Sequence, residues 1–284
     1  MSDRGAAIAA PRHEDGVRRG PRRAAVGAVG AVCLLLALIL GGAALVTWNH
    51  QRAAPVEVVG AEAALAEGFT VWERNADGTP VRFDPCSPIE VVLNPDGAPP
   101  SAHADLDEAV ARVAAASGLD LALVGTTDEP PSDPRLPYQP ERYGERWAPV
   151  LVTWARPGEP GVTLRDTDRG IAAPVAVGPE GERTYVSGQV VLNADRRDLR
   201  PGFGDRRDAW GATLLHELAH LVGLGHVDDP DQLMHTYPGE GEVAFGMGDR
   251  AGLAAVGADH GCREVPTPAP VRVRRPVGGG HGVP

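Results

Sequence analysis

Apolar residues recur in short runs along the middle of the chain, and these runs predict strands. Runs of five to eight residues rich in Val, Ile and Leu, separated by Gly, Pro and Asp, are typical of buried strands. The sequence contains five such segments, at residues 88–93, 119–124, 150–154, 171–177 and 185–192.

A different period, with apolar residues three and four positions apart, predicts three helices. The first follows Ser101 as its N-cap and ends before Gly118, with an apolar face formed by Leu106, Val110, Val113 and Ala114. The second covers residues 209–222 with Asp208 as its N-cap, and the third covers 249–256. Strands and helices in this order predict an α+β domain with one sheet, over residues 69–263. The pattern does not specify how the strands pair.

A run of 23 uncharged residues, 24–46, precedes the domain and is long enough to cross a membrane as a helix. Four Arg residues lie within the six positions before it, at 18, 19, 22 and 23. Positive flanks stay in the cytoplasm, so we expect residues 1–23 inside the cell and the domain outside, in a single-pass membrane protein. The alternative is a signal peptide cleaved near Gly42–Ala44, which would give a secreted protein.

Two further segments differ in composition from the domain. Residues 47–68 are expected to be a juxtamembrane linker, and the Pro- and Gly-rich residues 264–284 a disordered tail. The net charge is −11, and the segment after residue 23 is still more acidic, because the first 23 residues hold six Arg against three acidic side chains. Such an acidic domain argues against nucleic acid as a partner.

The chain contains three cysteines, of which Cys33 lies in the apolar run. Outside the cell, two thiols in one domain usually pair, so we expect a Cys86–Cys262 disulfide. The alternative is two free thiols.

The motif that indicates chemistry is HELAHLVGLGH at residues 216–226, with the spacing H-E-x-x-H-x-x-G-x-x-H. His216 and His220 are four residues apart, so their rings project from one helical face and can share a Zn²⁺ ion. Gly223 can adopt positive φ, end the helix and turn the chain back so that His226 becomes the third ligand. Glu217 is then placed to accept a proton from a zinc-bound water.

Three protein ligands and a free fourth position are typical of catalytic zinc. A closed structural site would need a fourth ligand, for which Asp228 and His235 are the candidates. A copper or nickel site would leave Glu217 without a role.

These residues resemble the zinc signature of the metzincin clan of metallopeptidases. The clan has a methionine turn beneath the metal, and Met234 lies eight residues after His226 in DPDQLMHTYP, which is similar to the matrixin subgroup. An ordinary core methionine is the alternative for Met234. The resemblance implies a mixed, mostly parallel sheet, a zinc-binding active-site helix, and a sheet edge at 171–177 to which an extended peptide can add as a strand.

The chain departs from the family at several positions. Tyr237 lies three residues after Met234, whereas the tyrosine that acts at the zinc of astacins and serralysins lies two after. We therefore interpret Tyr237 and Pro238 as a wall of the pocket beside the metal. No clear equivalents of the matrixin structural zinc and calcium ligands occur in residues 125–185, although Asp166 and Asp168 could bind a cation such as Ca²⁺.

The resemblance therefore implies a monomeric zinc endopeptidase that acts on polypeptides. The competing hypotheses are a non-catalytic surface or adhesion module stabilised by zinc, and a zinc hydrolase of another substrate class.

Overall fold

The computed structural model describes residues 68–237 and 240–273. The chain divides into two compact units, residues 1–58 and 59–284, and all the described residues belong to the second. The predicted cytoplasmic tail, the predicted membrane span at 24–46 and most of the linker lie outside the described residues, as do Pro238 and the end of the predicted tail. Among the described helices, none is both long enough and apolar enough to cross a bilayer.

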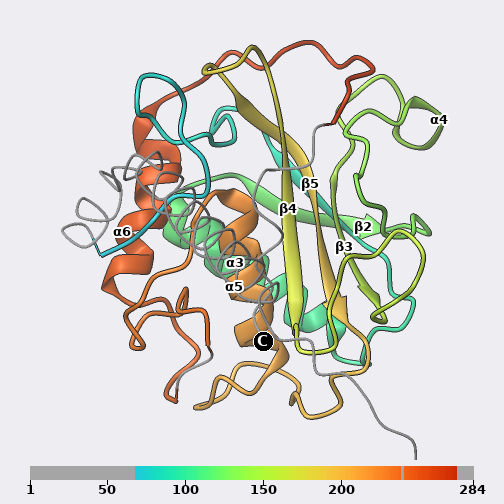
Figure 1. Ribbon diagram of the computed structural model, residues 1–284, viewed down its shortest axis with the longest axis vertical. Helices are drawn as coiled ribbons and strands as arrows, with labels where there is room; N and C mark the ends of the chain where they lie inside the picture. The colour runs from blue at the N-terminus through green and yellow to red at the C-terminus, as the bar shows by residue number, and fades with distance from the viewer. Residues whose placement is uncertain (1–67, 238–239, 274–284) are drawn as a thin grey trace, which may run out of the picture. The chain divides into compact units, whose positions relative to one another are not determined.

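Five strands form one mixed sheet in the order β2-β1-β3-β5-β4. They are β1 (Ile89–Leu93), β2 (Leu121–Thr126), β3 (Val150–Ala155), β4 (Gly170–Val177) and β5 (Thr184–Asn193). The first four in this order run parallel, and β4 alone pairs antiparallel, with β5. The structure confirms the α+β class and the mixed, mostly parallel sheet (Figure 1).

The burial of each strand follows its place in the sheet. Every residue of β3 is buried, and all but one of β5, because both faces of these inner strands are covered. At one edge, exposed residues of β2 alternate with residues that are buried or half-buried. At the other edge β4 contains Pro174, which has no amide hydrogen to donate and is tolerated at an edge. The segment predicted to be a sheet edge is therefore the terminal strand of the described sheet.

Two helices pack against one face of this sheet, as Figure 1 shows: α3 (Ala102–Ser117) and α5 (Trp210–Val222). Helix α6 (Met247–Val256) packs mainly on α3. All thirteen residues of α5 are buried, since this helix lies between the sheet and the other helices. The helix that contains the sequence motif is thus the central helix of the domain.

The predicted helix starts differ from the structure. Asp208 does not cap α5: the N-cap is Ala209, and the Asp208 carboxylate instead pairs with Arg200 at 2.7 Å. Ser101 is the N-cap of α3, but its hydroxyl donates to the Asp105 carboxylate rather than capping the backbone. Helix α6 begins two residues before the predicted start, because Asp249 is its third residue and reaches back to the amide of Gly246.

Other elements also differ from the prediction. Strand β2 lies two residues later than predicted. The sequence did not predict the four-residue helix α4 (Pro140–Tyr143) or the 3-10 turn η1 (Ala258–His260). Both are too short to produce a periodic pattern.

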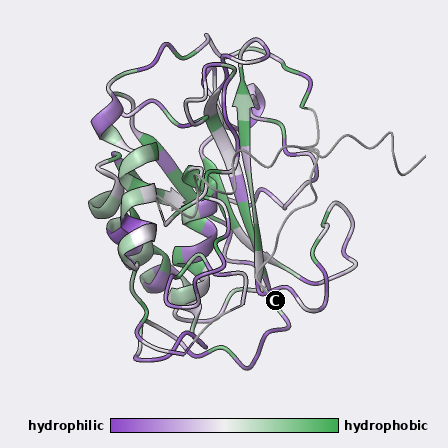
Figure 2. Ribbon diagram, turned by 60° about the vertical axis from the view of Figure 1, so that its left-hand side comes forward, coloured by the Kyte–Doolittle hydropathy of each residue, from purple (hydrophilic) through white to green (hydrophobic). Residues whose placement is uncertain are grey.

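The face of the sheet opposite the helices is covered by loops, as the rotated view in Figure 2 shows. The loop 127–149 reaches β5 through Arg135, whose guanidinium donates to the Ser187 hydroxyl and the Gly188 carbonyl. The same guanidinium makes a two-pronged ion pair with Glu129, and both side chains are buried. This pair fixes the loop on the sheet.

Candidate metal centre

The three histidines of the motif converge on one point. His216 and His220 lie on one face of α5, with their ring centroids 4.5 Å apart. His226 lies in the chain that follows, and its Nε2 is 3.1 Å from Nε2 of His216 and 3.1 Å from Nε2 of His220. Side chains up to 10 residues apart in sequence therefore present their nitrogens to a common centre.

Gly223 makes this convergence possible by ending the helix. Its φ is 121°, and its amide donates to the carbonyls of Ala219 and His220. A Cβ at this position would be strained in its backbone conformation and would lie 3.2 Å from the Val81 carbonyl oxygen. The chain reverses there, as the sequence motif requires for a third ligand.

The outer nitrogens of two rings are fixed by main-chain carbonyls. Nδ1 of His216 lies 2.8 Å from the Leu233 carbonyl oxygen, and Nδ1 of His220 lies 2.8 Å from that of Leu224. A carbonyl only accepts, so both Nδ1 atoms carry the hydrogen and both Nε2 atoms keep a lone pair facing the common centre. Metal-binding histidines usually have such a partner for the second nitrogen.

The donor set fits a zinc ion. An ion about 2.0–2.1 Å from each nitrogen would see a pair of nitrogens 3.1 Å apart at roughly 95–100°, close to a tetrahedral angle. Burial, together with the neighbouring His226 ring, lowers the pKa of His216 to about 3. This imidazole is therefore neutral at ordinary pH, which is the form that binds a metal.

No fourth protein ligand joins the three histidines among the described residues. Asp228 is exposed, and Nδ1 of His235 is engaged with the Tyr237 backbone. Neither candidate for closing the site is therefore part of the histidine group.

Glu217 is fully buried on α5 and lies against the first residue of β4. A Cβ placed on Gly170 would be 3.0 Å from Cγ of Glu217 and 3.1 Å from its Oε1. The absence of a side chain at Gly170 thus leaves room for the carboxylate. The sequence motif did not identify Gly170, because Gly170 and Glu217 are far apart in the sequence and meet only in the folded chain.

A segment near the start of the described chain also contacts the histidines. The Thr70 hydroxyl donates to the His226 carbonyl at 2.7 Å. The Trp72 ring lies edge-on to His220, with centroids 5.0 Å apart. No sequence signal pointed to either residue, because both lie far from the motif along the chain.

The loop that contains Met234 holds the His216 ring through a main-chain hydrogen bond. Met234 is buried, and its carbonyl accepts from the Val227 amide at 3.0 Å. The preceding residue, Leu233, supplies the carbonyl that holds His216. The buried Asp249 carboxylate accepts from the amides of Leu233 and Met234, at 2.6 and 3.2 Å.

The remaining sequence candidates lie in different surroundings. Tyr237 is 64% exposed, and its side chain lies beside His235. Asp168 is buried and pairs with Arg165 at 2.9 Å, whereas Asp166 is exposed. Within the described residues, these two aspartates do not meet a third metal-binding side chain.

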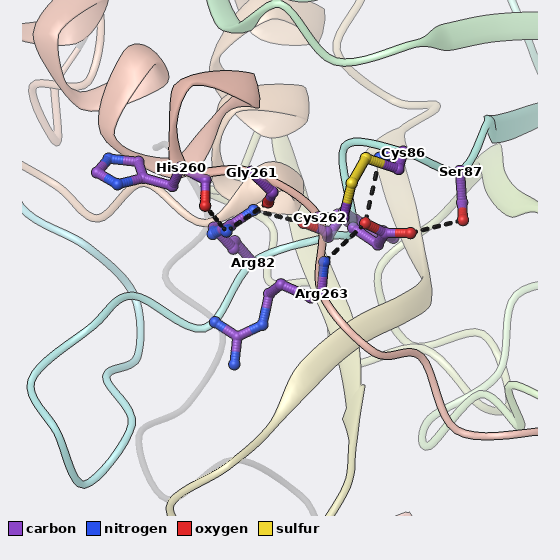
Figure 3. The surroundings of a disulfide bond; sticks show 9 residues. Arg82, Cys86, Ser87, His260, Gly261, Cys262 and Arg263 are labelled. Carbon is purple, nitrogen blue, oxygen red and sulfur yellow. Dashed lines mark hydrogen bonds between the residues drawn. A yellow bond between two sulfur atoms is a disulfide. The ribbon is translucent and has the colours of Figure 1, made fainter.

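Cys86 and Cys262 form the predicted disulfide, which joins the segment before β1 to the segment after η1 (Figure 3). The Arg82 guanidinium donates to the carbonyls of His260 and Gly261 beside it, at 3.0 and 2.9 Å. The amide of Arg263 donates to Asp84. The two ends of the domain are thus held together covalently and by hydrogen bonds.

No family model matches the chain, and no curated protein matches it. Among solved structures, the fold is similar to metalloproteinase-II from Bacteroides fragilis, with a TM-score of 0.35 and 14% sequence identity. The match covers 63% of this chain and 57% of that protein, so this chain spans less than two thirds of its length. At this level of similarity the case for a function depends on the residues of the metal centre.

Proposed function

We propose that this protein is a zinc-dependent endopeptidase of the metzincin type. His216, His220 and His226 hold the metal, and Glu217 is the general base. The observation that carries the proposal is the convergence of three imidazole Nε2 atoms, 3.1 Å from one another in two pairs, beside a fully buried glutamate on the same helix.

The histidines, Glu217 and two main-chain carbonyls have separate roles in the proposed reaction. A zinc ion bound by the histidines would lower the pKa of its water and polarise the substrate carbonyl. The Glu217 carboxylate takes the proton from the attacking water and passes it to the nitrogen of the leaving amine. The carbonyls of Leu233 and Leu224 keep the His216 and His220 rings oriented throughout.

Strand β4 supports a polypeptide as the substrate. It is the terminal strand of the described sheet, and its first residue, Gly170, lies against Glu217. A peptide that adds to this edge as a further strand passes the carboxylate in an extended conformation, with hydrogen bonds to the main chain. In this proposal Met234 forms the methionine turn, and Tyr237 and Pro238 line the pocket beyond it.

The test combines metal analysis with a peptide library. The purified protein should contain about one zinc per chain, and His220→Ala should lose it. Glu217→Gln should keep the zinc and the fold but lose about 10²–10⁴-fold or more in peptide hydrolysis. Glu180→Gln, the same change at an exposed position, is the matched control.

The outcomes separate the competing hypotheses. A protein that binds zinc but cuts no peptide would be a zinc-stabilised surface or adhesion module. If the Glu217→Gln variant cut peptides at the native rate, Glu217 would not be the general base.

We also propose that residues 24–46 anchor the protein in the cell membrane, with the catalytic domain outside. The support is the run of 23 uncharged residues and the four Arg residues before it. Protease added to intact cells or spheroplasts should remove the domain and leave a membrane-bound N-terminal fragment. A domain recovered from the medium with a new N-terminus between Ala43 and Ala54 would identify the segment as a cleaved signal.

A further inference from the structure

Arg207 is a buried cation that contacts the loop before Leu233 and has no role in the proposed chemistry. It stands three residues before α5 and is 7% exposed. Its guanidinium donates to three successive carbonyls: Nη1 to Pro230 at 3.1 Å and to Gln232 at 3.0 Å, and Nη2 to Asp231 at 2.8 Å. Its Nε donates a longer hydrogen bond to the Glu242 carbonyl, at 3.5 Å. Among the described residues it forms no ion pair with a carboxylate.

A buried guanidinium without a carboxylate is unusual, because burying a charge is costly unless it is well hydrogen-bonded. Here the carbonyls of one short loop accept the three shorter hydrogen bonds, and the Glu242 carbonyl accepts the longer one. Three consecutive carbonyls do not point to one side in a regular strand, where they alternate. Arg207 therefore stabilises a specific turn at residues 230–232, together with Asp229, which accepts from the amides of Asp231 and Gln232.

Two successive peptide groups connect Arg207 with the His216 ring. The Gln232–Leu233 peptide is held at both ends, its carbonyl by Arg207 and its amide by Asp249. The next peptide, Leu233–Met234, donates its amide to Asp249 and presents its carbonyl to Nδ1 of His216. The Leu233 carbonyl thus faces the metal ligand because both neighbouring groups are fixed.

We propose that Arg207 is a positioning residue for the metal centre: by binding the carbonyls of residues 230–232, it directs the Leu233 carbonyl at His216. This inference rests on the proposed zinc site. It gives Arg207 a function through hydrogen bonds to the main chain, with no contact to metal or substrate.

Lysine cannot replace arginine in this role. The guanidinium is a planar fork with five donors, whereas an ammonium is a compact point charge with three donors at one atom. The Arg207→Lys variant would keep the charge but could not span three carbonyls, so the loop would relax. Loss of a group that orients a metal ligand typically weakens metal binding by about 10–100-fold.

The test uses the full chain and two metals as probes. The zinc dissociation constant is measured by competition with a chromophoric chelator, and the Co²⁺-substituted protein is examined by its visible absorption, which reports ligand geometry. Arg207→Lys should bind zinc roughly 10–100-fold more weakly and show a changed Co²⁺ spectrum. Arg206→Lys is the matched control, because Arg206 is an exposed neighbour that pairs with Asp208.

A second variant provides a rescue. Arg207→Ala leaves a guanidinium-sized space beside three carbonyls, so millimolar guanidinium should restore part of its zinc affinity and of its Co²⁺ spectrum. A general loss of stability would not be repaired in this way, because guanidinium destabilises folded proteins.

The results distinguish this inference from the proposed function. If the unmodified protein binds no zinc, the proposed function is wrong and this inference is wrong with it. If the unmodified protein binds zinc and Arg207→Lys binds it within about twofold of that affinity, with an unchanged Co²⁺ spectrum, only the inference about Arg207 is wrong. If neither variant folds, Arg207 supports the fold as a whole, and the positioning role is also refuted.

Discussion

Replacing Glu129 by Gln should cost this domain a large part of its stability, because the change leaves Arg135 buried without its counter-ion. Glu129 is 4% exposed and Arg135 is 2% exposed. The carboxylate accepts four hydrogen bonds: two from Arg135 at 2.8 Å, one from Gln139 at 2.7 Å and one from the Tyr143 hydroxyl at 2.7 Å. A glutamine side chain offers one acceptor oxygen in place of two and carries no charge.

The magnitude follows from the burial of both partners. Removing one member of a buried ion pair typically costs about 3–5 kcal/mol. In a domain of roughly 150–250 residues, each kcal/mol shifts the Tm by about 2–4 °C, so we expect a decrease of about 6–20 °C at pH 7.

The effect should depend on pH in a defined direction. Burial by itself raises the pKa of Glu129, but the hydrogen bonds and the charge of Arg135 outweigh it and hold the pKa below its usual value. The stabilisation is therefore complete above the pKa of an unfolded glutamate, about 4.3, and is lost as the pH falls through the lower pKa of the folded state. The difference in Tm between wild type and Glu129→Gln should shrink on acidification.

Thermal unfolding followed by circular dichroism between about pH 7 and about pH 3.5 measures both quantities. Glu141→Gln, the same substitution at an exposed position of the same loop, should change the Tm by no more than about 2 °C. A Glu129→Gln variant that melts with wild type at pH 7, or whose deficit grows on acidification, would refute the reasoning.

Three further changes are expected to have measurable effects. Replacing Cys86 and Cys262 by Ser should lower the unfolding free energy by about 2–5 kcal/mol, measured by denaturant titration, since the bond closes a loop with a sequence separation of 176 residues. Gly170→Ala should reduce peptide hydrolysis at least about tenfold while zinc content stays constant, because the new Cβ would lie 3.0 Å from Cγ of Glu217 and 2.9 Å from Cδ2 of Leu192, so the carboxylate must shift. Gly204→Ala, where the nearest atom to a new Cβ lies 3.9 Å away, should leave hydrolysis unchanged. Trp72→Ala should weaken zinc binding, measured by chelator competition, because it removes the ring against His220.

The sequence predicted those parts of the fold that local patterns encode. Within residues 68–237 and 240–273, all five strands and all three long helices were located, because buried strands and amphipathic helices leave periodic apolar signals. The strand order was not predicted from these patterns, since pairing depends on contacts between distant segments. The predicted N-cap of α5, Asp208, was wrong because its carboxylate pairs with Arg200. A local sequence pattern does not reveal this pair.

The candidate metal centre was also predicted only in part. The spacing of the histidines encodes their convergence, because i and i+4 side chains share a helical face and Gly223 ends the helix where the motif places it. Gly170, Thr70 and Asp249 were not predicted, although each contacts the centre or the loop that supports it. Their contacts connect segments that are close only in the folded chain.

The carbonyls that orient His216 and His220 belong to Leu233 and Leu224, and a carbonyl is the same in every residue. Over evolutionary time, the side chains at these two positions can drift among apolar residues while the hydrogen bonds to the imidazoles persist. A histidine cluster whose rings are oriented by main-chain carbonyls needs few specific side chains around it, so its sequence signature can be short.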